Sequence, residues 1–268
     1  MKSVLPKQPK RASLWVWAAV AAGLVVLCAG GWLALQYYQS LPKTPAQHRA
    51  MAFDFLRRKS RAKTFAGPMG AAPQKAMPVL SNEVAQLRTD VHERLRDAGS
   101  WESIYRALGQ ELWLSFQYLS SPDPALRRTG LQLAEQARED ALNDANNGWL
   151  AARICDGFLL PYLDAADAES KAALSRDSIL NNAIQTFHQA NEIRRFAELA
   201  QHVIRDNPAS AEADRLRIQI GEALEEQDDL AGAVAQYRAV RNLGSFGRVM
   251  RRLPGLEAKL KAKAEPAR

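Results

Sequence analysis

The chain has 268 residues, 47% of them hydrophobic, with 15 glycines and 13 prolines. This length and composition exclude a wholly disordered or fibrous protein and allow one large domain or two small ones. The net charge of +7 is unevenly placed: residues 1–63 hold 11 basic side chains against one acid, residues 101–240 hold 13 against 22, and residues 241–268 hold 8 against 2. An acidic middle argues against a nucleic-acid-binding domain, which needs a basic stripe.

The first predicted element is a transmembrane helix over residues 14–38, where 25 consecutive residues carry no charge. About 20 apolar residues are enough to cross the hydrocarbon core of a bilayer. A cleaved signal peptide is the alternative, but its apolar region is usually shorter, and no small-residue cleavage site follows this stretch. Aromatic side chains at both ends fit the two membrane interfaces. They are Trp15, Trp17, Trp32, Tyr37 and Tyr38.

The charges around this span predict its orientation. Four basic side chains in the tail over residues 1–13 favour a cytoplasmic N-terminus and a soluble domain outside the cytoplasm, in the periplasm if the membrane is a bacterial inner membrane. The basic residues between 43 and 63 oppose this orientation. Ala19 and Gly23 form a small-xxx-small pair, which allows a homo-oligomer through close helix packing.

Residues 39–80 are predicted to connect the span to the soluble domain. Residues 45–63 mix apolar and basic side chains without one clean apolar stripe. This pattern fits an amphipathic helix on lipid headgroups, and a loose basic linker explains it equally well. Residues 65–78 are rich in Gly, Ala and Pro, which predicts a flexible tether.

Helical periodicity dominates residues 81–253, and no segment shows the alternation of a strand. A nearly all-apolar helix is expected over residues 149–160, ending at Pro161. A last helix is expected after Pro254, within a basic C-terminal segment over residues 254–268. The other helices are expected over residues 82–98, from Ser100 to Phe116, from Pro124 past Ala137, and over residues 176–191, 194–206, 210–226 and 230–242.

One stretch, within about residues 214–247, resembles a tetratricopeptide repeat (TPR), a pair of antiparallel helices that stacks on its neighbours. Small residues stand where the two helices cross, and large ones fill the space between them. The positions that carry the resemblance are Ile220, Gly221, Leu224, Ala233 and Tyr237. The resemblance implies an all-α protein in which a TPR-like solenoid follows the transmembrane helix. Pro208 stands three residues early for the family spacing, which predicts a first helix about one turn longer than the norm.

In the TPR family, the first helix of each repeat lines a concave surface that binds partners. The resemblance places five residues of this chain on that surface: Arg215, Ile218, Glu222, Glu225 and Glu226. Because the set is acidic, it implies a basic peptide segment as the partner. Ordinary solvated side chains are the alternative reading of the same residues.

Motifs for catalysis or metal binding are not found. None of the four histidines has metal-ligand spacing, and no phosphate-binding loop or nucleophile motif is present. Cys155 lies in an apolar stretch and is expected to be a buried core residue. Cys28 lies in the predicted span, so we expect no disulfide between the two. We therefore predict no catalytic residues, no metal and no cofactor.

These observations lead to one main hypothesis. The chain is expected to be a single-pass, membrane-anchored scaffold or adaptor that binds a protein partner through a TPR-like domain, in envelope assembly, secretion or protein quality control. A structural scaffold that binds anionic lipid through its basic ends is the first alternative. An enzyme with an unrecognised site is the second. No nucleic-acid partner is expected.

Overall fold

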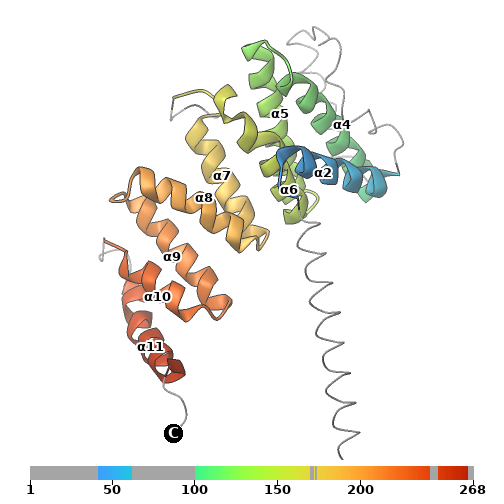
Figure 1. Cartoon of the computed structure of the whole chain (residues 1–268). Helices are drawn as coiled ribbons and strands as arrows, with labels where there is room; N and C mark the ends of the chain where they lie inside the picture. Colours follow the sequence, from blue (N-terminus) through green and yellow to red (C-terminus); the bar gives the residue numbers. More distant parts are fainter. Residues whose placement is uncertain (1–41, 62–99, 170–171, 173, 242–246, 265–268) are drawn as a thin grey trace, which may run out of the picture. The chain divides into compact units, whose positions relative to one another are not determined.

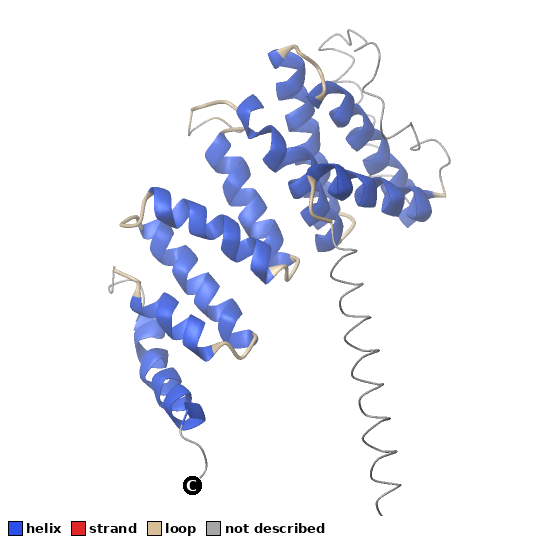
Figure 2. Cartoon of the chain, in the orientation of Figure 1, coloured by secondary structure: helices blue, strands red, loops and turns tan. Residues whose placement is uncertain are grey.

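A computed structural model describes residues 42–61, 100–169, 172, 174–241 and 247–264 (Figure 1). In these ranges every regular element is a helix, and the one isolated β-bridge joins Asp167 to Ser175 (Figure 2). The predicted all-α class is therefore confirmed.

The chain divides into two compact units, residues 1–43 and residues 44–268, and all the helices named below belong to the second. No helix among the described residues is both long enough and apolar enough to cross a bilayer. The span predicted over residues 14–38 lies outside those residues, together with its interface aromatics. The predicted tether over residues 65–78 and the helix over 82–98 lie outside them too.

The first described helix, α2 (Pro45–Ser60), belongs to the folded domain. Thr44 caps it through a capping box, in which its hydroxyl accepts from the Gln47 amide at 3.3 Å and Gln47 Oε1 accepts from the Thr44 amide at 3.1 Å. Phe53 and Leu56 are buried in the main core. We expected this segment to be a juxtamembrane helix or a loose linker, and the structure instead makes it a core helix, because its apolar side chains complete the packing of later helices.

Helices α4 (Trp101–Leu119) and α5 (Pro124–Asn143) pack closely against each other. A Cβ atom at Gly130 would lie 2.8 Å from the Leu119 amide nitrogen and 2.9 Å from the Ser115 carbonyl oxygen, so only glycine allows this approach. The Ser115 hydroxyl in turn donates to the Gly130 carbonyl at 2.8 Å. The hydroxyl thus satisfies a backbone acceptor inside a buried contact.

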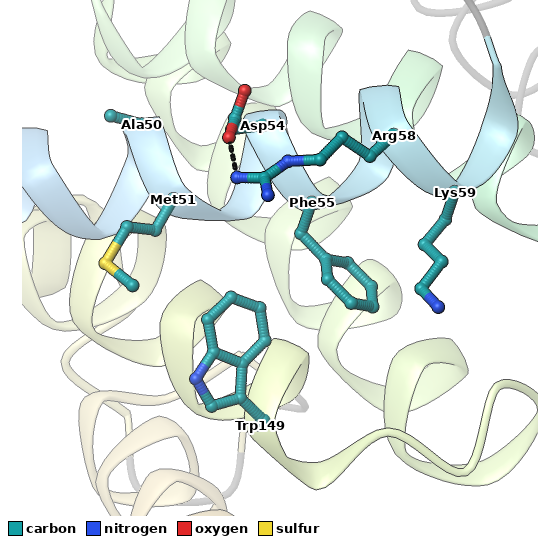
Figure 3. A pocket seen from close by; sticks show the side chains of 7 residues that line it. All are labelled: Ala50, Met51, Asp54, Phe55, Arg58, Lys59 and Trp149. Carbon is teal, nitrogen blue, oxygen red and sulfur yellow. Dashed lines mark hydrogen bonds and ion pairs between the residues drawn. The ribbon is translucent and has the colours of Figure 1, made fainter.

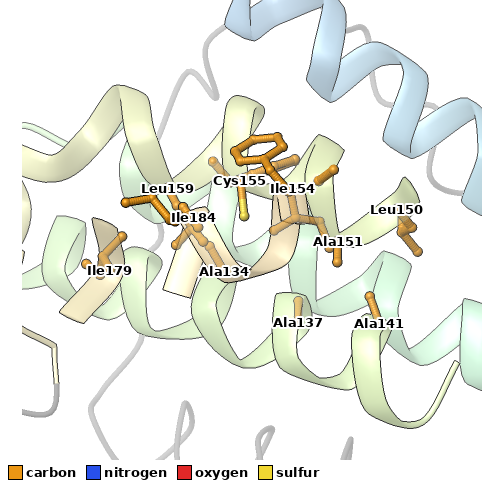
Figure 4. Close-up of a cluster of buried hydrophobic side chains, with 14 of the residues drawn as sticks. Ala134, Ala137, Ala141, Leu150, Ala151, Ile154, Cys155, Leu159, Ile179 and Ile184 are labelled. Carbon is orange, nitrogen blue, oxygen red and sulfur yellow. The ribbon is translucent and has the colours of Figure 1, made fainter. Parts of the chain in front are cut away.

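The expected apolar helix over 149–160 is three consecutive elements: α6 (Gly148–Ile154), a π-helical turn η1 (Cys155–Leu159) and a 3-10 turn η2 (Leu160–Ala165). All residues from Leu150 to Leu159 are buried, and Figure 4 shows part of the cluster they form. The chain does not stop at Pro161 as expected. The proline stands in the first turn of η2, where its missing N–H has no helical partner to lose.

From α6 onward, each helix packs against the next one in the chain (Figure 1). The predicted helices of this region are all present within a few residues of their expected bounds. They are α7 (Arg176–Gln189), α8 (Ile193–Asp206), α9 (Ala211–Glu226) and α10 (Leu230–Arg238). Helix α11 (Gly247–Ala264) follows them, and its start does not match the expected one.

The last helix differs from its prediction because α11 begins at Gly247 and contains Pro254 in its interior. An interior proline removes one backbone hydrogen bond and destabilises a helix. Val249 and Leu256, on either side of the proline, are both buried against α10. Tertiary packing on both sides of the proline therefore stabilises the helix despite the lost hydrogen bond.

The crossing of α9 and α10 depends on Gly221. A Cβ atom there would lie 2.4 Å from Cε1 of Tyr237, so the aromatic ring rests directly on the helix backbone. Ile220, Ala233 and Tyr237 are buried, and Leu224 packs against the same cluster. Four of the five residues predicted to pack this helix pair thus lie at the contact, whereas the fifth, Ile220, is buried in the main core. Helix α9 has 16 residues and starts after the Ser210 cap, which agrees with the extra turn predicted from Pro208.

Replacing Gly221 with alanine should lower the free energy of unfolding by about 1–3 kcal/mol, because the new methyl group overlaps the Tyr237 ring. The measurement is urea denaturation of the full chain in detergent, followed by far-ultraviolet circular dichroism. Gly255→Ala is the matched control, since its methyl group would meet nothing within 4 Å. Equal stability of the two variants would contradict the close approach at Gly221.

Candidate protein-interaction surfaces

The acidic face of α9 was predicted to bind a basic segment, and α11 lies against part of it. Arg252 of α11 reaches two of the predicted residues: its Nη1 is 3.7 Å from Glu222 Oε1, and its Nη2 is 3.4 Å from Glu225 Oε2. Ile218 packs against the apolar cluster that α11 helps to form. The structure therefore brings three of the five predicted residues, Ile218, Glu222 and Glu225, together with the C-terminal helix.

The other two predicted residues do not take part in this contact. Arg215 is exposed and pairs with Glu212 on its own helix, with 2.6 Å between Nη2 and Oε1. Glu226 is exposed at the last turn of α9 and has no ion pair with any described residue. It is the member of the set that stays available to a partner.

A buried tyrosine joins the acidic face to the helix crossing. The Tyr237 hydroxyl donates a hydrogen bond to the Glu225 carboxylate. Burial, and after it the Glu225 charge, raise the pKa of Tyr237, so the hydroxyl keeps its proton at every physiological pH. Glu225 is thus held between a neutral donor on α10 and a cation on α11.

Helix α11 is held by weak contacts. Its apolar residues share a small cluster with α10 that is separate from the main core, formed by Ala233, Val234, Tyr237, Val249 and Leu256. Its other ion pairs are exposed, with Lys263 Nζ 2.5 Å from Asp228 Oδ2 and Glu257 Oε1 2.7 Å from Arg238 Nη2. Exposed pairs contribute at most about 1 kcal/mol each and are screened by salt.

A second surface, which sequence reasoning missed, lies where α2 meets α6 (Figure 3). It is a hollow of about 510 Å³ lined mainly by α2, with Met51, Phe55 and Lys59 on one side and Trp149 of α6 on the other. A neighbouring hollow of about 450 Å³ shares Lys59 and is closed by Trp101 and Tyr105 of α4. We call the two hollows together the aromatic groove, formed by Met51, Phe55, Lys59, Trp101, Tyr105 and Trp149.

The sequence held one signal for this groove. The apolar residues of α2 did not form a single stripe, and the structure shows the reason: they serve two faces. Phe53 and Leu56 point into the core, whereas Met51 and Phe55 line the groove. The partner aromatics come from helices about 45 and 90 residues later in the chain, so no local pattern could have assembled them.

Helix α2 is tied to the rest of the domain by buried charges. Asp156, on the π-helical turn, has a side chain only 5% exposed and lies 2.6 Å from Nη2 of Arg195 on α8. Its other carboxylate oxygen lies 3.7 Å from Nε2 of His48 on α2. Arg153 of α6 pairs with Glu192 at the start of α8 and also bonds His48. We call this network the ionic clasp: His48, Arg153, Asp156, Glu192 and Arg195.

The protonation state of His48 follows from these neighbours. Arginine can only donate, so His48 Nδ1 must accept from Arg153 Nη1, 3.0 Å away, and the ring proton belongs on Nε2 beside Asp156. The imidazole is therefore neutral. Burial is the main cause that lowers its pKa from 6.5 to about 4, and the Asp156 charge opposes the shift only in part.

The thiol next to the clasp is protected by burial. Cys155 is fully buried as predicted, and burial raises its pKa, so it stays a thiol rather than a reactive thiolate. Across the described ranges, no three or more His, Cys, Asp or Glu side chains are placed to hold a metal ion. The clasp itself links α2, α6 and α8, and removing one member would leave a buried charge unpaired.

No protein-family model, curated protein or solved structure matches the chain. Function is therefore inferred from the surfaces described above.

The clasp should make stability depend on pH. Between pH 4 and 6.5 the unfolded chain binds a proton at His48 that the folded chain does not, so stability is complete above about pH 6.5 and falls as the pH drops toward 4. The slope from this one group is at most about 1.4 kcal/mol per pH unit. Urea denaturation of the full chain at several pH values between 5 and 7 measures it.

His48→Gln is the control for this experiment. Its amide oxygen can still accept from Arg153, but the side chain does not titrate, so the slope between pH 5 and 7 should become flatter. The same slope in both proteins would show that His48 is not protonated on unfolding in the way the clasp requires.

Proposed function

We propose that the chain is a membrane-anchored scaffold for protein–protein interaction, in which the acidic face of α9 binds a basic helical segment of a partner. The seating of α11 supports this more than any other observation. It is a basic helix that lies on this face through Arg252, Glu222 and Glu225. A face that accepts one basic helix within the chain has the charge and shape to accept another from a partner.

The weak attachment of α11 also supports the proposal. Its cluster is separate from the main core, and its ion pairs are exposed. Its departure would leave α4 to α8 packed as they are. A partner helix with apolar residues and arginines in the same register can therefore compete with α11 for Glu222 and Glu225.

The proposal includes a membrane anchor, which is the transmembrane helix predicted over residues 14–38. The predicted tether over residues 65–78 does not separate that span from the domain, because α2 comes before it in the chain. Six residues of sequence lie between the span and α2, and α2 is fixed in the core by Leu56 and the ionic clasp. A scaffold of this kind holds its partner close to a bilayer.

The proposal predicts that full-length chain, cross-linked in native membranes and purified in detergent, carries a protein partner in stoichiometric amount. The double variant Glu222→Lys and Glu226→Lys should recover at least about tenfold less of it, because like charges repel across the interface. Arg252→Glu should recover more, because it loosens the competing α11. Quantitative mass spectrometry of the purified complexes measures both effects.

Glu139→Lys is the matched control, since Glu139 is an exposed acid on α5, away from the α9 face. It should leave recovery unchanged. Full recovery by the double variant would remove the acidic face from the proposal. The absence of any stoichiometric partner would remove the scaffold function itself.

A further inference from the structure

We propose that the aromatic groove is a second, separate binding site, which takes a short acidic peptide segment with apolar side chains on both sides of its carboxylate. The site lies on α2, α4 and α6, whereas the proposed α9 face belongs to the other end of the domain's helix order. The inference does not depend on the proposed use of the α9 face.

The shape of the groove sets the apolar part of the ligand. Phe55 lines the first hollow and contacts an aromatic ring of each, with its ring centroid 5.2 Å from that of Trp149 in the first hollow and 5.4 Å from that of Tyr105 in the second. Each hollow is large enough for one aromatic or long aliphatic side chain. A segment that crosses Phe55 can therefore place one side chain on each side of it.

The exposure of the aromatic rings shows that the site is open. Trp101 is 59% exposed and Trp149 is 38% exposed, and they are two of the three large hydrophobic residues exposed in the described part of the chain. Such side chains lose contact with water when a ligand covers them, and tryptophan is among the commonest residues at the energetic centre of an interface.

The charge of the groove sets the polar part of the ligand. Lys59 lines both hollows, and its ammonium lies 5.8 Å from the Phe55 ring centroid without an ion pair to any described residue. The first hollow is also lined by one acid, Asp54, whose charge is already paired with Arg57 and Arg58. A carboxylate placed beside Phe55 would therefore meet an ammonium that lines both hollows and has no ion pair within the described ranges.

The basic rim extends this complementarity. The last turn of α2 carries Arg57, Arg58 and Lys59, and Arg61 follows the helix. On the other side, Glu102 next to Trp101 is paired with Arg106 at 3.2 Å. The surface that a ligand approaches is thus basic, which favours an acidic segment.

A peptide fits these features better than a lipid surface does. Headgroup contact uses side chains that protrude from a convex face and sink between lipids. The aromatics here instead line two hollows, and Tyr105 is buried at the base of one of them. Hollows of this volume take side chains, and the single cation between them sets the position of one carboxylate.

The test uses full-length chain in phosphatidylcholine nanodiscs as the target for a phage library of randomised twelve-residue peptides. Enriched peptides should carry Asp or Glu between two aromatic or long aliphatic residues. Fluorescence anisotropy of the synthesised peptides then gives dissociation constants. Trp101→Ala and Lys59→Glu should each weaken binding at least about tenfold. When the Lys59→Glu variant is the target of the selection, the enriched peptides should carry Lys or Arg in place of their Asp or Glu.

Two controls separate the groove from general effects on the surface. Met250→Ala removes an exposed apolar residue of α11, and Lys261→Glu reverses an exposed charge there. Neither should change binding, and circular dichroism should show every variant folded. The variant with Glu222→Lys and Glu226→Lys should also bind normally, so failure of the α9 face and failure of the groove give different results.

Three results would overturn the inference. The first is a library that yields no enriched peptide. The second is a set of peptides whose affinity is the same for wild type, Trp101→Ala and Lys59→Glu. The third is lipid contact without peptide binding: headgroup-brominated lipids quench the tryptophan fluorescence of the wild-type chain, and Trp101→Phe and Trp149→Phe each reduce this quenching. That result would assign the surface to lipid.

Discussion

The fold depends on the way α2 is held in the domain. This helix comes first among those described, yet it packs against α4, α6 and the π-helical turn that follow much later in the chain. Leu56 and Phe53 supply the apolar contact, and the ionic clasp joins His48 to Asp156 and Arg153. Because buried charges need all their partners, the clasp tolerates only one placement of α2. The groove exists only because this placement brings Phe55 beside Trp149.

Two basic segments of the chain have neighbours inside the folded domain. Its basic C-terminal segment packs on α10 and pairs with acids of α9 and of the turn after it, with Arg252 beside Glu222 and Lys263 beside Asp228. Its basic segment near residue 60 borders the aromatic groove. Charge patterning alone had suggested lipid contact for both segments. The structure instead gives each of them neighbours within the folded unit, because complementary charges on adjacent helices lower the cost of packing them together.

Part of the α9 face could be predicted from short stretches of the sequence. The resemblance to a tetratricopeptide repeat identified Gly221 and Tyr237, because two consecutive helices that pack closely show this in a short stretch of sequence. The same reasoning placed Glu222 and Glu225 on one face of α9, where they lie. It could not foresee that Arg252 would cover them, because Pro254 made the preceding residues look like the end of the domain.

By itself, the sequence determined the all-helical class, the bounds of α4 and of α7 to α10 to within a few residues, the burial of Cys155 and the packing of α9 on α10. These properties follow from periods of three to four residues and from local capping, which act over short stretches of chain. Only the tertiary structure decided that residues 45–60 are a core helix, that α11 covers the acidic face and that six residues from three helices make a groove. Each of these features brings together segments that are far apart in the sequence, and no local pattern encodes which distant surface a helix will meet.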